Sequence, residues 1–569
     1  MRLLSGAALA ALALSCANTA LADTYVTNVR GVTLDERGQV QRFTGFIIGE
    51  DGKISRVIGE RDKLPRRSDV DFHVDGQGRV VIPGLIDSHV HVPDMGFALM
   101  TLDLSGTNSL DEALAMLRAY AAENPERPWI TGTGWNQEKW GLGRFPTAAE
   151  LDAVVPDRPV WLERIDSHAG WANSRALAAG GVTAQSRDPD GGRIERDGSG
   201  APAGVLVDAA MAMVGSKVPP PRPSDEDRAF TLAQRLLLSE GVTAVADMGT
   251  TIEEWQTYRR AGDTGKLLIR IAAYAADTAT MQLIGGPGPT PWLYDDRLKL
   301  NGVKLYIDGA LGSRGAWLKA PYADAPETRG LPVMTDTRLG NLMSRASIDN
   351  FQVAVHAIGD AGNAAALSAI EDLAVTYKGD RRWRIEHAQV VAPSDIARFG
   401  QNGIVASMQP QHQTSDRVMA EARLGPDRLA GAYAWKSIAA TGAPLAFGSD
   451  APVEPPDPFY GLSVAISRID ASGQPAGGWQ PAERVTPAQA LAAYTSGGAY
   501  AMFAEGKLGR IAPGYRADFL MVDRDPVTAS PAELRQTRVL ETWINGLRVW
   551  RESDKVIPDD EDTEIDGGR

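Results

Sequence analysis

The sequence of 569 residues contains a single cysteine, Cys16. One cysteine excludes a disulfide framework and a metal site built on several thiolates. The apolar run at the N-terminus is shorter than the roughly 20 residues that a membrane-spanning helix needs, and we expect no transmembrane segment in the mature chain. Basic residues are in deficit, and the net charge of −14 argues against nucleic acid or an anionic membrane surface as a partner.

Residues 1–22 have the features of a secretory signal peptide. They contain one basic residue, an apolar run and the small-residue sequence ALA before Asp23. We expect cleavage near Ala22 and a soluble protein that is secreted or periplasmic. Lipidation at Cys16 is the alternative, although the alanine in ALSC fits a lipoprotein signal poorly.

The remaining chain is long enough for more than one domain, and the 43% of hydrophobic residues in the full sequence can form a large core. Short alternating apolar runs with Gly and Asp turns occupy residues 23–84, and the pattern returns in residues 505–555. We expect both segments to form one small β-sandwich domain, with residues 85–504 inserted between them as a larger domain. The acidic residues 556–569 are predicted to be a disordered tail.

The larger domain contains eight short apolar segments in series, each followed by a helix-like stretch. They are LIDSHVH, TAVADM, LIRIAAY, VKLYID, FQVAVHA, RWRIEHA, IVASMQP and LAFGSD. This alternation is typical of an α/β fold and predicts a (β/α)8 TIM-like barrel. A tryptophan-rich insertion of about residues 93–225 separates the first two strands, and we expect it to cap the active-site face.

Histidine is scarce, with seven in the chain, yet four of the seven lie at ends of predicted barrel strands. His89 and His91 form an H-x-H pair whose side chains point to one face of a strand. His356 and His387 end two later strands, and Asp450 ends the eighth. Any one of these histidines alone would be interpreted as a core residue, but strand ends of a barrel converge on one face. The pattern predicts a divalent-metal site, for which zinc suits the imidazole and carboxylate donors.

Lys304 lies in the apolar strand segment GVKLYID, where the burial of an ammonium group costs several kcal/mol. An unmodified lysine that pairs with Asp308 or with a substrate carboxylate is one interpretation of this position. A chemically modified lysine is the other.

Several long motifs occur in a fixed order along nearly all of the mature chain: PGLIDSHVH, DSHAGWANS, GVKLYIDGALGSRGA, VHAIGD, RIEHAQ, SMQPQH and FGSDAPVEPPDP. In these motifs the chain resembles the amidohydrolase superfamily of metal-dependent hydrolases. It is most similar to the YtcJ-like branch, which includes N-substituted formamide deformylases. The segment GRIAPGYRADFLMVDRDP looks like the returning sandwich strand of that family.

The resemblance implies a set of metal ligands and a modification of Lys304. The implied ligands are His89, His91 and Asp450 on one ion, His356 and His387 on a second, and a carbamylated Lys304 that bridges the two. An anionic carbamate between two cations removes the problem of a buried ammonium group. Single-metal relatives also occur in the superfamily, so one or two ions are expected. Dimers are common there as well, which makes a homodimer one expectation.

Other residues in the motifs are assigned roles at the substrate. His168, in the insertion, is expected to reach the site and polarise a substrate carbonyl, with a structural role in the cap as the alternative. His412 is expected to face the substrate or to support a metal ligand. Arg314 and Asp308 are assigned to substrate binding, although Arg314 can instead brace the cap. Trp135 is expected to form part of an aromatic wall, or else to be a packing residue.

The resemblance thus predicts an exported metal-dependent hydrolase for a small amide-type substrate. It would cleave an amide, N-formyl or N-acyl C–N bond with a metal-activated water, and Asp450 would accept the proton of that water and pass it to the leaving nitrogen. A cyclic amide, a lactone or a deamination substrate is one alternative. A periplasmic binding or regulatory protein on the same barrel is another, and an exported structural protein whose histidines only pack is a third.

Overall fold

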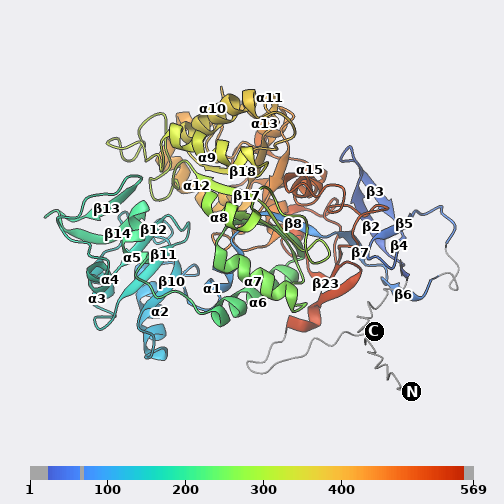
Figure 1. The fold of residues 1–569 in the computed structure, drawn as a ribbon, viewed down its shortest axis with the longest axis horizontal. Coiled ribbons are helices and arrows are strands. Elements are labelled where there is room, and N and C mark those ends of the chain that lie inside the picture. Colours follow the sequence, from blue (N-terminus) through green and yellow to red (C-terminus); the bar gives the residue numbers. More distant parts are fainter. Residues whose placement is uncertain (1–22, 65–69, 556–569) are drawn as a thin grey trace, which may run out of the picture.

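The structure is a computed structural model that describes residues 23–64 and 70–555 (Figure 1). The predicted signal peptide 1–22 and the predicted tail 556–569 lie outside the described residues, and both stay predictions. In Figure 1 a barrel occupies the centre, a cap lies on one side of it and a β-sandwich lies on the other. Among the helices of the described segments, none is both long and apolar enough to cross a bilayer.

The barrel consists of eight parallel strands that coincide with the eight predicted segments, which confirms the predicted fold class. In the order of the sheet they are β8 (Leu85–Val90), β15 (Val242–Thr250), β16 (Arg270–Ala275), β17 (Leu298–Tyr306), β18 (Gln352–Ala357), β19 (Arg384–His387), β20 (Val405–Met408) and β21 (Leu445–Phe447). Every residue of β8, β16, β18 and β19 is buried, as expected for parallel strands that are covered on both faces.

Backbone hydrogen bonds at the predicted metal ligands close the seam of the barrel. The Asp450 N–H donates to the carbonyl of His89 over 2.7 Å. The His91 N–H donates to the carbonyl of Ala451 over 2.9 Å. The first and last strands of the barrel are therefore held together where their candidate ligands project.

Helices follow the barrel strands and cover the outside of the barrel. They are α6 (Pro223–Ser239), α7 (Ile252–Asp263), α8 (Thr278–Gly285), α9 (Asp336–Ile348), α10 (Asp360–Thr376), α11 (Ile396–Gln401), α12 (Pro410–Leu424), α13 (Trp435–Ala439), α14 (Pro458–Ser467), α15 (Pro487–Ala493) and α16 (Ser496–Ala501). Several of these helices begin at a residue whose side chain caps the first turn. In α7 the Thr251 hydroxyl accepts the Glu254 N–H, and the Glu254 carboxylate accepts the Thr251 N–H.

The β-sandwich combines strands from both ends of the described chain. One sheet has the order β5 (Ile54–Ile58), β4 (Gly45–Ile48), β1 (Thr24–Thr27) and β6 (Phe72–Asp75). The other has the order β24 (Leu547–Arg551), β23 (Val539–Ile544), β22 (Phe519–Val522), β7 (Val80–Pro83), β2 (Arg30–Leu34) and β3 (Val40–Phe43), with α17 (Pro531–Leu534) before β23. A fully buried ion pair between Arg270 of β16 and Asp518, at 2.6 Å, joins the sandwich to the barrel.

The cap is a separate sheet with its own hydrophobic core. Its strands, in order, are β13 (Gly192–Arg196), β14 (Pro202–Asp208), β12 (Ala169–Ala172), β11 (Val160–Arg164), β10 (Ile130–Trp135) and β9 (Leu102–Asp103). Its helices are α2 (Leu110–Glu123), α3 (Ala148–Asp152), α4 (Ser174–Ala179) and α5 (Ala212–Gly215). The cap strands begin at Leu102 and end at Asp208, so the cap does not include all of the predicted insertion 93–225. The first residues of that insertion form α1 (Val92–Ala98), which packs against α6 beside the barrel.

Candidate metal centre

A cavity of about 530 Å³ lies between the carboxyl ends of the barrel strands and the cap. Barrel residues line one part of it, and cap residues such as Asn136, His168 and Asp208 line another. Most of the predicted ligands face this cavity: His91, Lys304, His356, His387 and Asp450. The prediction that these strand ends converge on one face therefore agrees with the geometry.

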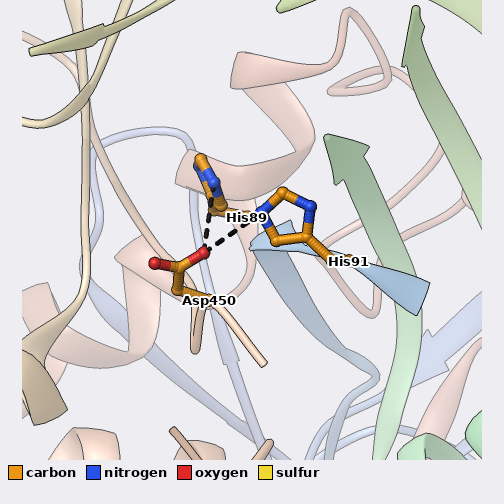
Figure 2. Close-up of side chains that lie close together, drawn as sticks. All are labelled: His89, His91 and Asp450. Atoms are coloured by element: carbon orange, nitrogen blue, oxygen red, sulfur yellow. Dashed lines mark ion pairs between the residues drawn. The ribbon is translucent and has the colours of Figure 1, made fainter. Parts of the chain in front are cut away.

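His89, His91 and Asp450 form the first candidate ligand group (Figure 2). His89 Nε2 and His91 Nε2 each lie 3.4 Å from Asp450 Oδ1, and both rings point toward that oxygen. His89 is fully buried, whereas the His91 side chain is 22% exposed toward the cavity. Burial alone raises the pKa of Asp450, but the imidazoles of His89, His91 and His412 outweigh it and hold that pKa below its usual range.

His387 and His412 form a second group around the other oxygen of the same carboxylate. His387 Nδ1 lies 3.8 Å and His412 Nε2 lies 3.5 Å from Asp450 Oδ2. Together with Asp450, their donor atoms all lie within 4.8 Å of one another. Asp450 therefore faces two imidazoles through each oxygen. His412 also lines the cavity, so both roles predicted for it, contact with the substrate and support of a metal ligand, stay predictions.

His356 lies beside these groups rather than within either of them. Its ring centroid is 4.6 Å from that of His387 and 5.0 Å from that of His168. Its Nε2 atom is 3.7 Å from Asp308 Oδ1, too far for a hydrogen bond. Whether His356 binds the second ion, as the resemblance implies, stays a prediction.

The donor atoms of the site fit a divalent metal ion. His356 Nε2 and His412 Nε2 are buried and have no hydrogen-bond partner among the described residues. A buried polar atom without a partner is costly unless something satisfies it. Imidazole nitrogens around a shared carboxylate are typical ligands of zinc and similar metals, so an ion here would satisfy these atoms.

Two of the candidate ligands have an unusual backbone conformation. His387 has φ +73° and Asp450 has φ +63°, both in the left-handed region that residues other than glycine rarely adopt. Such conformations cost about 1–3 kcal/mol and persist where the surrounding structure imposes them, often at functional sites. His387 is the last residue of β19, and this backbone conformation turns its side chain into the cavity.

Lys304 lies at the centre of the ligand cluster, on β17. Its side chain is 1% exposed, and its Nζ atom lies 3.2 Å from His89 Nε2 and 4.6 Å from the centre of the Tyr306 ring. Burial lowers the pKa of Lys304 to about 8, despite the nearby carboxylates of Glu386 and Asp450. The residue is thus a buried amine directly beside a candidate metal ligand.

Two charged residues inside the barrel, Arg384 and Glu386, were not identified from the sequence. Glu386 Oε2 accepts the His89 Nδ1–H over 2.7 Å, which leaves the His89 Nε2 lone pair facing the ligand group. Arg384 donates to Glu386 Oε1 over 2.8 Å, and both residues are fully buried. Their alternation in the strand sequence RIEH was the one available signal, since residues two apart share a face.

His387 has a comparable partner in Gln409. The His387 Nδ1 atom lies 2.9 Å from Gln409 Oε1, a carbonyl oxygen that can only accept. This contact places the ring proton on Nδ1, so Nε2, and not the Nδ1 atom near Asp450 Oδ2, is the atom of His387 that could bind a metal ion. It orients His387 in the same way that Glu386 orients His89.

The remaining predicted residues lie in different surroundings. Asp308 is fully buried and accepts backbone N–H groups of Trp317, Ile358 and Gly359 at 2.8–3.0 Å. Asp308 lines the cavity, but these bonds show that it mainly holds the loop after β17 to the loop after β18. Burial raises its pKa to about 7, against the effect of the three N–H groups.

Arg314 and Trp135 lie outside the lining of the cavity, which does not support the substrate-binding roles assigned to them. Arg314 donates to Asp324 over 2.9 Å and braces its own loop rather than the cap. Trp135 is fully buried in the core of the cap, and its indole N–H donates to the carbonyl of Leu162. Trp135 is a packing residue because the cap core encloses its whole ring.

The family can now be assigned from comparisons with known proteins. The model of the amidohydrolase family matches residues 73–550. The chain belongs to the amidohydrolase family. This finding confirms the resemblance seen in the sequence motifs, and the matched range includes every candidate ligand.

Three curated relatives of this amidohydrolase chain cover nearly its whole length. LONG AFTER FAR-RED 3 of Arabidopsis thaliana is 37% identical over 93% of this chain and 92% of its own. YtcJ of Bacillus subtilis (strain 168) is 35% identical over 90% of this chain and 96% of its own. N-substituted formamide deformylase of Arthrobacter pascens is 28% identical over 93% of this chain and 98% of its own.

The solved structures include an uncharacterized metal-dependent hydrolase from Pyrococcus horikoshii OT3. It superposes with a TM-score of 0.73 at 27% identity, over 90% of this chain and 99% of that one. Together with the family match, this likeness supports a metal-dependent hydrolase.

Proposed function

We propose that this amidohydrolase is an exported enzyme that hydrolyses a C–N bond in a small amide, N-formyl or N-acyl substrate. The observation that carries the proposal is the single carboxylate of Asp450, which faces two imidazoles through each of its oxygens at the floor of a cavity. The N-substituted formamide deformylase among the relatives supports a formyl or related acyl group as the target.

His89, His91 and Asp450 would hold one divalent ion, and His387 with His356 or His412 would hold a second. Zinc is the metal we propose, because imidazole and carboxylate donors suit it. When bound, the ion supplies Lewis acidity, which polarises a carbonyl and makes a water molecule acidic near neutral pH.

Asp450 and His168 perform the proton and carbonyl chemistry in this proposal. Asp450 is an anion at neutral pH, because the surrounding imidazoles hold its pKa low. It lines the cavity and would accept a proton from the attacking water. His168 lines the cavity from the cap and contacts the substrate on the side away from the barrel floor.

We include the carbamylation of Lys304 in the proposal. The ammonium group would lose one proton, and the neutral amine would then add to carbon dioxide and lose a second proton, which converts a buried cation into an anion. A cation 3.2 Å from His89 Nε2 opposes a metal ion at that nitrogen, whereas a carbamate attracts one. The low exposure of Lys304 supports a form that is paired with metal rather than solvated.

A hydrolysis panel tests the proposed reaction. Zinc-loaded protein is expected to hydrolyse N-formyl or N-acyl amides, to lose this activity with a chelator and to regain it when zinc is added. Release of the amine and of the acid is measured for each compound. If the metal-loaded protein hydrolyses only lactones or cyclic amides, or deaminates its substrates, the acyclic C–N assignment is wrong. If it acts on no compound, the proposal that this protein is a hydrolase is wrong.

A further inference from the structure

The cap contributes a histidine–aspartate pair to the cavity. His168 directly precedes β12, and Asp208 is the last residue of the neighbouring antiparallel strand β14. The Asp208 N–H donates to the carbonyl of His168 over 3.0 Å, so the two residues lie opposite each other across the ladder. Their side chains also meet, because His168 Nδ1 lies 2.7 Å from Asp208 Oδ1.

The backbone of Asp208 is strained in order to make this contact. It has φ +50° and ψ −125°, a conformation that an L-residue other than glycine rarely adopts. A residue held in such a region costs about 1–3 kcal/mol, and strain of this kind clusters at functional sites. Glycine would fit the backbone better, so the carboxylate itself must be needed at this position.

The barrel loop that contains the motif GALGSRG leaves room for this carboxylate. A β-carbon on either Gly309 or Gly315 would lie closer than 3.0 Å to Asp208 Oδ2. Neither glycine has a positive φ, so their role is close approach rather than chain reversal. The Asp208 side chain is 3% exposed, and Oδ2 has no hydrogen-bond partner in the described part of the chain. His168 is therefore the ionic partner of a buried carboxylate at the edge of the cavity.

The geometry determines which nitrogen of His168 faces the cavity. The carboxylate can only accept, so Nδ1 carries a proton and Nε2 is the free position of the ring. His168 lines the cavity, and its ring lies 5.0 Å from that of His356, on the cap side of the ligand cluster. The Asp208 carboxylate fixes the orientation of the ring and stabilises its positive charge whenever Nε2 also carries a proton, as an aspartate does beside the histidine of a catalytic triad.

We propose that His168 is the proton donor to the leaving nitrogen and that Asp208 is the positioning residue that orients it. The inference rests on the proposed hydrolysis and adds a role that the sequence motifs did not suggest for either residue. As the C–N bond breaks, its electron pair stays on nitrogen, which takes the proton from His168 Nε2. The ring is left neutral, with its Nδ1–H still on Asp208. The proton that Asp450 removed from the attacking water returns through solvent to His168.

The dependence on the leaving group tests this assignment. Two substrates with the same accepted acyl group are compared: an N-alkyl amide, whose leaving nitrogen must be protonated, and a p-nitrophenyl ester, whose phenolate leaves without a proton. Asp208→Asn is expected to lower kcat/KM for the amide by about 10²-fold or more, in line with general-acid catalysis, with a far smaller loss on the ester. Metal content, measured on the same samples, is expected to match the wild type.

Matched controls separate a catalytic effect from a folding defect. Asp197→Asn makes the same change at the exposed far end of the β13–β14 hairpin and should leave both substrates unaffected. If Asp208→Asn fails to fold, His168→Gly is used instead, and added imidazole is expected to restore amide turnover more than ester turnover.

Two outcomes distinguish the inference from the function on which it rests. Equal losses on amide and ester in Asp208→Asn or His168→Gly would overturn the proton-donor role and leave the hydrolase intact. A metal-loaded wild type that turns over neither substrate would overturn the proposed function, and this inference with it.

Discussion

Asp450→Asn is expected to lower kcat by about 10²–10⁴-fold, the range for loss of a positioned general base, while the protein keeps its fold and much of its metal. The asparagine retains one oxygen beside the His89 and His91 imidazoles, and this oxygen can still bind a metal ion together with them. It cannot accept a proton from water, because an amide is not a base at neutral pH. Steady-state kinetics on the amide identified in the hydrolysis panel, with metal analysis of the same sample, measures both effects.

The control for Asp450→Asn is the same change in the same loop. Asp457 follows Asp450 by seven residues and caps α14, where its carboxylate accepts the Tyr460 N–H over 3.0 Å. Asparagine is an equally good cap, so Asp457→Asn should keep normal activity. An Asp450→Asn variant with wild-type turnover would remove Asp450 from the mechanism.

Glu386→Gln is expected to weaken metal binding by about 10–100-fold, as loss of the group that orients a ligating histidine does. Both oxygens of Glu386 accept hydrogen bonds: Oε1 from Arg384, and Oε2 from Arg384 and His89. An amide nitrogen at either place would oppose a donor, so one of these contacts must break. The affinity is measured by competition with a chromophoric zinc chelator.

The same substitution should also reduce stability. Arg384 is fully buried, and removal of the charge of its partner leaves it uncompensated, which costs about 3–5 kcal/mol in the free energy of unfolding. Urea unfolding of the metal-free protein isolates this effect from metal binding. Ser407→Ala is the control, since it deletes only the 3.0 Å bond from Arg384 to the Ser407 hydroxyl and should cost about 1 kcal/mol. Unchanged metal affinity in Glu386→Gln would show that His89 does not need this partner.

The barrel was predictable because its evidence is local. Each parallel strand is an apolar run covered on both faces, and eight such runs recur along the chain with helices between them. The positions of His89, His356 and His387 followed from the same reasoning, because a histidine at the carboxyl end of a barrel strand faces one common rim.

The arrangement of side chains around that rim was not predictable in the same way. His412 lies on α12 rather than on a strand, and its approach to Asp450 depends on how the helix packs. His387 reaches the cavity only through a left-handed turn that strand alternation does not indicate. Trp135 is in a tryptophan-rich segment that resembles a binding wall, but it packs within a cap core that the sequence does not define.

Asp208 shows a further limit of sequence reasoning. The segment GVLVDAAM contains no pattern that separates a catalytic partner from an ordinary strand residue. Its importance depends on a contact with His168, which is 40 positions away in the chain, and on two glycines of a barrel loop. Interactions between a cap and a barrel are set by tertiary packing, which neither periodicity nor spacing records.

The central claim is that this fold holds catalytic metal ions at Asp450 and its surrounding histidines. Elemental analysis of the protein purified without any chelator tests the claim most directly. The account predicts about two divalent ions per chain, as in two-metal hydrolytic sites, and their loss in a variant that lacks both His89 and His91. A content of one ion per chain would agree with a metal-dependent hydrolase but would contradict a carbamate on Lys304 that bridges two ions. Protein that is folded, active on an amide and free of metal would contradict the account.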